Sequence, residues 1–405
     1  MGDNRLTRRG FLSTSATGLM ATGLLGLSSR LVNSQEPSKK DDKKEDILHR
    51  TLGKTGLNIP IVSMGVMNSN NPEIVQASYE IGIRHFDTAA TYQYGRNEQM
   101  VGEVIKRLGV RDKVVIGTKE LGPAERSEMT PEQIKKRLIN LCEGSLRRLK
   151  TDYIDILYIH GVAGKEDVDK PEIVDGFATL KKQGKIRFSG VTTHESMAEV
   201  INAVAEKMSY DVVLPAFNVT MADDIELLNA IEKAAAAGIG IIAMKTQAGG
   251  QRLASEEASR RFSKSTIMKA SLKWVLNNKS ISTAIPGFDN FENMREDFSV
   301  AEGIEYTLDE KEFLSGNKIK LSMGFCRQCR QCRPTCPGDV DIPALMRVHM
   351  YAASYGNLVH ARATLDDIPE NRSIRTCASC RECAARCARG VDIDRRISEL
   401  KAMYV

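Results

Sequence analysis

The sequence predicts an α/β chain in which a (β/α)8 barrel precedes a smaller, mainly helical domain. Between about residues 48 and 300, eight short apolar runs alternate with longer helical segments. Eight strand–helix units are the number that closes a parallel barrel. Beyond residue 320 the alternation stops, and closely spaced cysteines take its place. A length of 405 residues leaves room for both parts.

The predicted barrel strands are short runs rich in Ile, Val and Leu, as is typical of buried parallel strands. Among the helical segments, Pro131–Leu149 repeats apolar residues along one face and carries proline in its first turn. An open, doubly wound sheet is the alternative, but Met64–Asn68 after the first strand lacks its glycine-rich turn. The barrel is therefore favoured, with strands at Ile61–Val66, Ile83–Phe86, Val114–Thr118, Ile154–Ile159, Ile186–Gly190, Val212–Leu214, Ile239–Ala243 and Thr283–Ile285.

The N-terminal segment has a different character. Paired Arg8 and Arg9 precede a weakly apolar stretch that ends near Leu27. This order resembles a twin-arginine signal, which exports folded proteins; a basic tail is the alternative. The stretch is too short and too rich in glycine and serine to span a membrane comfortably. We expect an exported, periplasmic or extracytoplasmic protein that touches the membrane only through an uncleaved signal.

Composition limits the classes of partner. Hydrophobic residues make up 42% and charged residues 27% of the chain, as in an ordinary globular protein with a core. Much of the formal net charge of +5 lies in the first 35 residues, so no basic face favours nucleic acid. The predicted organisation is a signal segment (residues 1–34), a charged linker (35–46), the barrel (47–315) and a cysteine-containing domain (316–405).

Eight of the nine cysteines form two runs with the same spacing, C-x-x-C-x-x-C-x-x-x-C. This spacing is typical of bacterial ferredoxins with two 4Fe–4S clusters, in which the fourth cysteine of each run crosses to the other cluster. Zinc ribbons and disulfides fit triple cysteine runs less well. The predicted ligand sets are Cys326, Cys329, Cys332 and Cys387 for one cluster, and Cys377, Cys380, Cys383 and Cys336 for the other.

The long gap between the two runs resembles helical ferredoxin modules. One amphipathic helix is expected from about Pro343 to Leu358, with Asp341 as its N-cap. The arginines among the cysteines are expected to solvate the surface. Cys142, which lies on a barrel helix, is expected to be a small buried apolar residue.

Polar residues stand at the ends of predicted strands, where barrel enzymes place their chemistry. They are Asp87, Lys119 and His160, with Tyr92 shortly after Asp87. A phenol with a pKa of about 10 needs tuning to exchange protons near neutrality. We predict that Tyr92 is the general acid/base, Lys119 lowers its pKa, Asp87 orients Lys119, and His160 orients a carbonyl.

The surrounding motifs, Phe86–Gly95, Gly117–Lys119 and Tyr158–His160, resemble the aldo-keto reductase signature. Arg50–Leu57 resembles the short hairpin that precedes the barrel in the same family. The resemblance extends over about residues 48–300. It implies reduction of a small carbonyl, or oxidation of an alcohol, with NAD(H) or NADP(H).

The resemblance also implies cofactor contacts, and here the sequence departs from the family. Thr192 stands where serine is common, and Met244 replaces the aromatic residue that stacks on nicotinamide. Asp289 stands where a basic residue would meet a 2′-phosphate, which favours NAD(H). Thr192-x-x-Glu195 also fits a helix capping box, and His194 is expected at the surface. The expected contacts are Thr192, Asn218, Met244, Gly287, Asp289 and Asn293.

These features predict an exported carbonyl–alcohol oxidoreductase with a captive nicotinamide cofactor and two clusters, which implies a redox protein partner. Because clusters pass single electrons and nicotinamide passes a hydride, a mediator such as a flavin stays open. The alternative class is an electron-transfer protein whose barrel is a docking scaffold or binds flavin. The intact set of four polar residues favours the enzyme, whereas the altered cofactor contacts favour the alternative.

Overall fold

The computed structural model describes residues 46–122, 129–248, 256–316 and 325–405. Residues 45–405 form one compact unit. The predicted signal segment and nearly all of the predicted linker lie outside the described residues, so both stay predictions. The boundary expected at residues 315 and 316 falls beside another such gap. Within the described ranges, no helix has the length and apolar character needed to cross a membrane.

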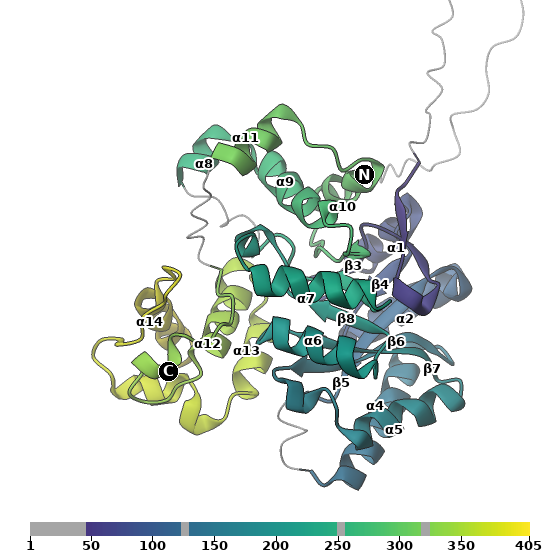
Figure 1. Cartoon of the computed structure of the whole chain (residues 1–405), viewed down its shortest axis with the longest axis horizontal. Coiled ribbons are helices and arrows are strands. Elements are labelled where there is room, and N and C mark those ends of the chain that lie inside the picture. The colour runs from purple at the N-terminus through teal and green to yellow at the C-terminus, as the bar shows by residue number, and fades with distance from the viewer. Residues whose placement is uncertain (1–45, 123–128, 249–255, 317–324) are drawn as a thin grey trace, which may run out of the picture. The chain divides into compact units, whose positions relative to one another are not determined.

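A parallel eight-stranded sheet forms the barrel predicted from the sequence (Figure 1). Adjacent strands follow chain order, and bridges from Val62 to Ala284 and from Gly65 to Gly287 join the last strand to the first. The strands are β3 (Met64–Gly65), β4 (His85–Asp87), β5 (Val115–Glu120), β6 (Ile154–Val162), β7 (Ile186–Thr193), β8 (Val212–Pro215), β9 (Gly240–Ala243) and β10 (Thr283–Ala284). Each predicted run contributes one of them.

A β-hairpin precedes the barrel, as the family resemblance implied. Strands β1 (His49–Thr51) and β2 (Asn58–Pro60) pair antiparallel. Leu52 follows β1, is fully buried and packs against the start of β9, where a Cβ on Gly240 would lie 2.7 Å from its side chain. Glycine at residue 240 therefore lets the hairpin close the barrel at the end opposite the predicted catalytic residues.

Helices surround the strands (Figure 1). The longest, α4 (Pro131–Leu149), has the predicted bounds and begins at a capping box in which Thr130 and Gln133 bond reciprocally. It buries Ile134 and Leu138 against the barrel. The other helices of this part are α1 (Pro72–Ile81), α2 (Arg96–Leu108), α5 (Pro171–Lys182), α6 (Met197–Lys207), α7 (Ile225–Ala236), α8 (Glu256–Arg261), α9 (Lys264–Asn277), α10 (Phe291–Phe298) and α11 (Leu308–Gly316).

The C-terminal region is helical and has its own hydrophobic core. Its helices are α12 (Ile342–His349), α13 (Leu358–Asp366) and α14 (Ile393–Tyr404). Asp341 caps α12 as predicted, because its carboxylate accepts from the Ala344 amide at 3.2 Å. The prediction of a single helix that reaches Leu358 is wrong. After a π-turn over Met350–Ser354, Gly356 adopts φ +66° and breaks the helix, so that α13 begins in a new direction.

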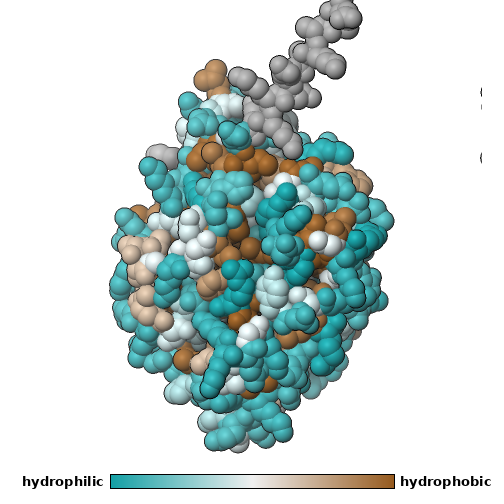
Figure 2. Space-filling model, turned by 90° about the vertical axis from the view of Figure 1, so that its right-hand side faces the viewer, coloured by the Kyte–Doolittle hydropathy of each residue, from teal (hydrophilic) through white to brown (hydrophobic). Residues whose placement is uncertain are grey.

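Hydrophilic side chains predominate on the face shown in Figure 2, and apolar side chains form smaller separate areas between them. The largest exposed apolar residues are scattered over many elements, among them Ile225 in α7, Leu308 in α11 and Leu358 in α13. Isolated apolar residues of this kind are normal on soluble surfaces. The buried contacts at the barrel mouth therefore tell more about function than the outer surface does.

Candidate functional site

A buried ion pair lies at the base of the site. Asp87 ends β4 and Lys119 lies in the neighbouring strand β5, so the barrel register places them together. The Lys119 ammonium donates to the Asp87 carboxylate and to the Thr88 carbonyl oxygen, the latter at 2.7 Å. Their side chains are 1% and 2% exposed. Burial lowers the pKa of Lys119, and the charge of Asp87 opposes that shift.

Tyr92 lies directly beside this pair. The Lys119 ammonium is 5.1 Å from the centroid of its ring, and the side chain is 8% exposed. Burial, and then the charge of Asp87, raises the pKa of Tyr92 well above its ordinary value. This direction is opposite to the lowering expected from Lys119. In this state the phenol is protonated, which suits a proton donor better than a base.

His160, near the end of β6, completes the group of four predicted residues. Its ring centroid lies 6.4 Å from that of Tyr92, and the two rings meet edge to face. The barrel thus brings Asp87, Tyr92, Lys119 and His160 to one place, although they come from three strands and a following turn. Their catalytic roles stay predictions.

The cluster domain, residues 325–405, covers this group from the other side. His360 of α13 packs edge to face on Tyr92 with ring centroids 5.1 Å apart, and Tyr351 lies 4.5 Å from His360. The Tyr351 hydroxyl accepts a 2.9 Å hydrogen bond from Lys245, which follows β9. Burial, and then the Lys245 charge, lowers the pKa of His360 to about 3, so its imidazole is neutral near pH 7.

The structure corrects two expectations about the end of β7 and the loop that follows it. The Thr192 hydroxyl accepts from the Gly161 amide at 2.9 Å, and α6 begins only after Ser196, so Thr192 caps no helix. His194 does not belong to the open surface. Its Nδ1 atom is buried and has no partner among the described residues, and burial with the Lys245 charge lowers its pKa well below the ordinary value.

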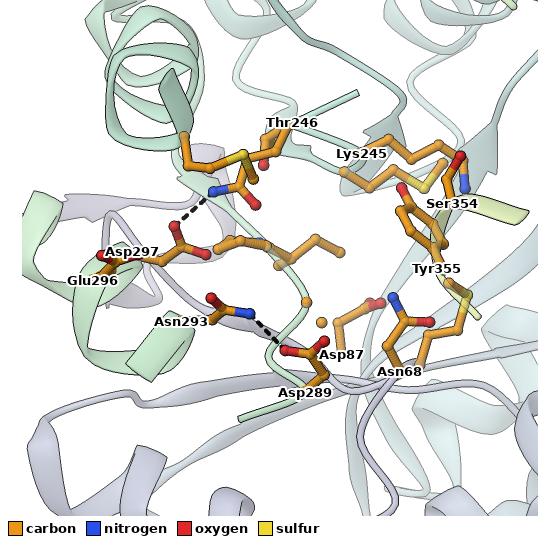
Figure 3. A pocket seen from close by; sticks show the side chains of 18 of the residues that line it. Asn68, Asp87, Lys245, Thr246, Asp289, Asn293, Glu296, Asp297, Ser354 and Tyr355 are labelled. Carbon is orange, nitrogen blue, oxygen red and sulfur yellow. Dashed lines mark hydrogen bonds between the residues drawn. The ribbon is translucent and has the colours of Figure 1, made fainter. Parts of the chain in front are cut away.

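A cavity of about 400 Å³ leads away from Tyr92 (Figure 3). Four of the six expected cofactor contacts line it, namely Met244, Gly287, Asp289 and Asn293. The other two are buried in protein contacts. Asn218 accepts from the Thr220 amide at 3.1 Å and donates to the Lys245 carbonyl oxygen. The Thr192 hydroxyl accepts a hydrogen bond from the Gly161 amide.

The end of the cavity away from Tyr92 is acidic, and neighbouring side-chain amides donate hydrogen bonds to two of its carboxylates. Asn293 donates to Asp289 at 2.6 Å, and Gln247 donates to Asp297 at 2.6 Å, as the dashed lines in Figure 3 mark. Burial raises the pKa of Asp297 to about 7. Lys264 is the basic residue at this end. Carboxylates here suit ribose hydroxyl groups better than a phosphate.

One wall of the cavity comes from the cluster domain. Ala353, Ser354 and Tyr355 line it opposite the barrel residues, and Figure 3 shows Ser354 and Tyr355 beside Lys245. The Asn357 amide donates to the Met67 carbonyl oxygen and to the Asn68 side chain, both at 3.2 Å, which ties the domain to the loop after β3. A long ligand in this cavity would therefore be enclosed by both parts of the chain.

Sequence reasoning missed this wall and several barrel residues on the cavity. Lys245, Thr246 and Gln247 directly follow the seventh barrel strand, so their position was a usable signal. The Thr246 hydroxyl is buried and has no partner among the described residues, as a group that awaits a ligand would be. No comparable signal marked Tyr351 or His360, because nothing in the sequence says where a separate domain docks.

The cysteines gather as the spacing predicted. Cys326, Cys329, Cys332 and Cys387 line one small cavity of the cluster domain. Burial, and then the nearby thiols of Cys336, Cys383 and Cys380, raises the pKa of Cys377. These four cysteines are the second predicted set. Within the described ranges, no three His, Cys, Asp or Glu side chains are close enough for a single metal ion.

Arginines beside the first set attach it to the barrel rather than only solvating the surface. Arg327 and Arg389 both pair with Asp223, after β8, at 2.7 Å. Arg330 pairs with Glu195, after β7. The cluster held by the first set is therefore the one whose flanking residues contact the barrel mouth.

Comparisons with known proteins agree with this architecture. Residues 63–266 match the model of the aldo/keto reductase family, and residues 325–392 match a 4Fe–4S dicluster domain. L-galactose dehydrogenase of Arabidopsis thaliana is 26% identical over 299 residues, which cover 66% of this chain and 92% of that protein. Aldo-keto reductase YhdN of Bacillus subtilis is 32% identical over 128 residues, or 32% of this chain and 38% of that protein.

Among solved structures, the holo form of aldo-keto reductase AKR11C1 from Bacillus halodurans superposes with a TM-score of 0.55 at 20% identity. The match covers 67% of this chain and 96% of that one. At this identity the likeness concerns the fold. The family match extends over half of the chain and includes Asp87, Tyr92, Lys119 and His160. The chain therefore belongs to the aldo/keto reductase family and is an oxidoreductase that carries a 4Fe–4S dicluster domain after its barrel.

Proposed function

We propose that this protein is an exported oxidoreductase that interconverts a carbonyl and an alcohol and keeps its nicotinamide dinucleotide captive. The observation that carries the proposal is the position of Tyr92. It lies at the inner end of a cavity lined by expected cofactor contacts, beside the Asp87–Lys119 pair and beneath the cluster domain. Such a combination serves proton transfer to a buried oxygen atom.

The residues of the site have distinct tasks in this proposal. Tyr92, protonated because its pKa is raised, donates a proton to the carbonyl oxygen and recovers it in the reverse direction. Lys119, held by Asp87, stabilises the negative charge that Tyr92 acquires. His160 orients the carbonyl from the adjacent strand end. A nicotinamide dinucleotide, when bound, supplies the hydride.

The cavity favours NAD(H). Met244 lies where the nicotinamide end is expected, next to Tyr92, and Asp289 with Asn293 lies at the adenosine end. The Asp289 carboxylate accepts hydrogen bonds from ribose hydroxyl groups and repels a 2′-phosphate. Thr246 offers a hydroxyl without a partner among the described residues. The cluster domain supplies one wall of the cavity, which supports retention of the nucleotide.

The clusters add one-electron capacity when bound. The set Cys326, Cys329, Cys332 and Cys387 is connected to the barrel through Arg327 and Arg330, so we assign it the inner place in an electron route. The other set would then exchange electrons with a redox protein. A hydride carries two electrons and a cluster passes one, so the route needs a mediator, for which a flavin is the first candidate.

The decisive experiment is mass spectrometry of the nucleotide released when anaerobically purified, cluster-replete protein is denatured. We expect NAD in near-stoichiometric amount. NADP in its place would overturn the interpretation of Asp289 while preserving the captive cofactor. Flavin without nicotinamide, or no nucleotide, would overturn the hydride proposal and favour the electron-transfer alternative. Fusion of residues 1–46 to a reporter that is exported only when folded tests the predicted signal, with the Arg8→Lys, Arg9→Lys double variant as control.

A further inference from the structure

Lys245 occupies an unusual place at the barrel mouth. It follows Met244, which forms a bridge with Ala216 just after β9, and its backbone is left-handed, with φ +54°. Like Tyr92, it lines the cavity. Its ammonium donates to the Tyr351 hydroxyl at 2.9 Å and sits 4.7 Å from the centroid of that ring. Tyr351 of the cluster domain thus holds the Lys245 ammonium of the barrel near Tyr92, the predicted proton donor.

The other cations near this point have acidic partners. Asp87 pairs with Lys119, and Glu195 pairs with Arg330 and, at 4.0 Å, with Arg347. Within the described part of the chain, no carboxylate lies at ion-pair distance from Lys245. A half-buried ammonium whose hydrogen-bond partner among the described residues is a phenol has capacity for an anion, because an ammonium has three hydrogens to donate.

Two neutral imidazoles accompany Lys245. Burial, and then the Lys245 charge, lowers the pKa of both His194 and His360, so that their rings are uncharged near pH 7. The Nδ1 atoms of both rings are buried and have no partner among the described residues. Neutral imidazole offers one N–H donor, so the two histidines add hydrogen-bonding groups to the same region without a charge of their own.

We propose that Lys245, assisted by His194 and His360, binds a carboxylate group on the carbonyl substrate. The inference rests on the proposed function and names its substrate class: an oxo acid or an aldehyde that carries a carboxylate. In the reduction, the carbonyl π bond breaks. The reduced nicotinamide of the proposed function would give up a hydride to the new C–H bond and become oxidised, and the Tyr92 O–H bond breaks to supply the proton of the new alcohol, which leaves a phenolate beside Lys119. The carboxylate makes and breaks no bond; it fixes the position of the carbonyl.

The pyrophosphate of the cofactor is the other anion that could reach Lys245. Lys264 supplies a matched control, because it lines the same cavity at the end where Asn293 lies, 3.4 Å from the Asn293 side-chain oxygen. Lys245→Met and Lys264→Met remove the same charge from opposite ends of one cavity. A substrate carboxylate depends on the first, whereas the nucleotide depends on the second.

The experiment compares carbonyl pairs that differ only in the acid. Anaerobic full-length protein reduces 4-carboxybenzaldehyde or 4-methylbenzaldehyde, and pyruvate or methyl pyruvate, with measurement of kcat/KM and of the nucleotide each variant retains. We expect the acid of at least one pair to be preferred. Lys245→Met should cost that acid about tenfold to a hundredfold, mainly in KM, and spare the neutral partner. Tyr351→Phe should cost less, because it removes only the support of Lys245.

Each result decides the matter. A preference for the neutral carbonyl in both pairs, or an acid preference that survives Lys245→Met, overturns the proposal. Loss of retained nucleotide in Lys245→Met but not in Lys264→Met assigns Lys245 to the cofactor and also overturns it. If no carbonyl is reduced, the proposed function fails separately. Calorimetry with oxamate then decides: binding that Lys245→Met abolishes supports the anion site, and no binding to the unsubstituted protein refutes it.

Discussion

The two sides of the barrel mouth are built by different physical means. The barrel side holds a buried ion pair, Asp87 and Lys119, on adjacent strands. The cluster-domain side presents neutral aromatic groups, Tyr351 and His360, which are kept in place by packing and by a contact with Lys245. The first arrangement is rigid and is costly to disturb. The second depends on how two parts of the chain dock.

This difference sets which contacts are lost at the smallest cost in stability. Removing one member of a buried pair leaves a charge without compensation, which destabilises a protein by about 3–5 kcal/mol. The ion pairs that dock the cluster domain are more exposed: the Asp223 side chain is 62% exposed. Exposed pairs contribute about 0–1 kcal/mol and weaken in salt. The predictions below follow that order, from the buried pair to the docking contacts.

The largest effect is expected from Lys119→Met. Turnover should fall by about 10²–10⁴-fold, because Tyr92 loses the cation that stabilises its phenolate. Stability should fall by about 3–5 kcal/mol, because Asp87 stays buried without its partner. Carbonyl reduction and thermal unfolding measure the two effects. The double variant Asp87→Asn, Lys119→Met should regain stability but not activity; if activity returns, the assigned role of Lys119 is wrong.

The next effect concerns the clusters. Cys332→Ser and Cys387→Ser should each remove the same cluster, because both residues line one cavity although they belong to different runs. Cys336→Ser should affect the other cluster. Electron paramagnetic resonance of the reduced protein, with iron analysis, identifies which signal is lost and shows whether iron falls by about half. Cys142→Ser, at a fully buried barrel position, is the control with full iron content.

Loss of one signal in Cys332→Ser and of the other in Cys387→Ser would contradict the crossed ligand sets. That outcome would assign each run of four cysteines to its own cluster. The position of Cys387 on the same cavity as Cys326, Cys329 and Cys332 would then need another explanation.

A smaller, pH-dependent effect is expected at Asp297. Its pKa in the folded protein is about 7, raised by burial, against an ordinary value of 3.8. The folded state therefore holds a proton that the unfolded state releases, and this contribution to stability, present below about pH 4, is lost as pH rises through 7. In thermal unfolding, the stability of Asp297→Asn relative to the unsubstituted protein should rise between pH 5 and pH 8. A constant difference would show that Asp297 is ionised throughout.

The smallest effect is expected from Asp223→Asn, which removes the partner of Arg327 and Arg389. We expect a loss of about 1 kcal/mol at low ionic strength that largely disappears in high salt. Glu370→Gln removes a pair with Arg375 inside the cluster domain, whose side chains are 69% and 77% exposed, and is the control. If only Asp223→Asn also slows electron transfer from the clusters, docking matters beyond stability.

Patterns that are local in the chain were sufficient for much of the site. The strand runs, helix α4 and the barrel followed from hydrophobic periodicity and proline positions. Asp87, Lys119 and His160 could be placed together because the ends of parallel strands meet at one face of a barrel. The spacing also predicts the crossed cysteine sets, and Cys387 does line one cavity with Cys326, Cys329 and Cys332; that each set holds one cluster stays a prediction.

Predictions failed where a contact spans the chain. His194 is predicted at the surface, but its side chain is half-buried, and burial followed by the Lys245 charge lowers its pKa. Thr192 fitted a capping pattern, but its hydroxyl bonds the Gly161 amide on a neighbouring strand. The expected helix to Leu358 is interrupted because Gly356 lets the chain turn α13 toward Tyr92. At Thr192 a tertiary contact outweighed a weak local preference, whereas Gly356 is a helix breaker within the segment itself.

The sequence by itself therefore determined the barrel, the polar residues at its strand ends and the grouping of eight cysteines. Short-range periodicity and covalent spacing are enough for these features. Only the tertiary structure decided that Tyr351 and His360 cover Tyr92, that the cluster domain walls the cavity, and that Lys245 lacks a carboxylate among the described residues. The docking of two domains depends on many weak contacts between distant residues, and no local pattern encodes their sum.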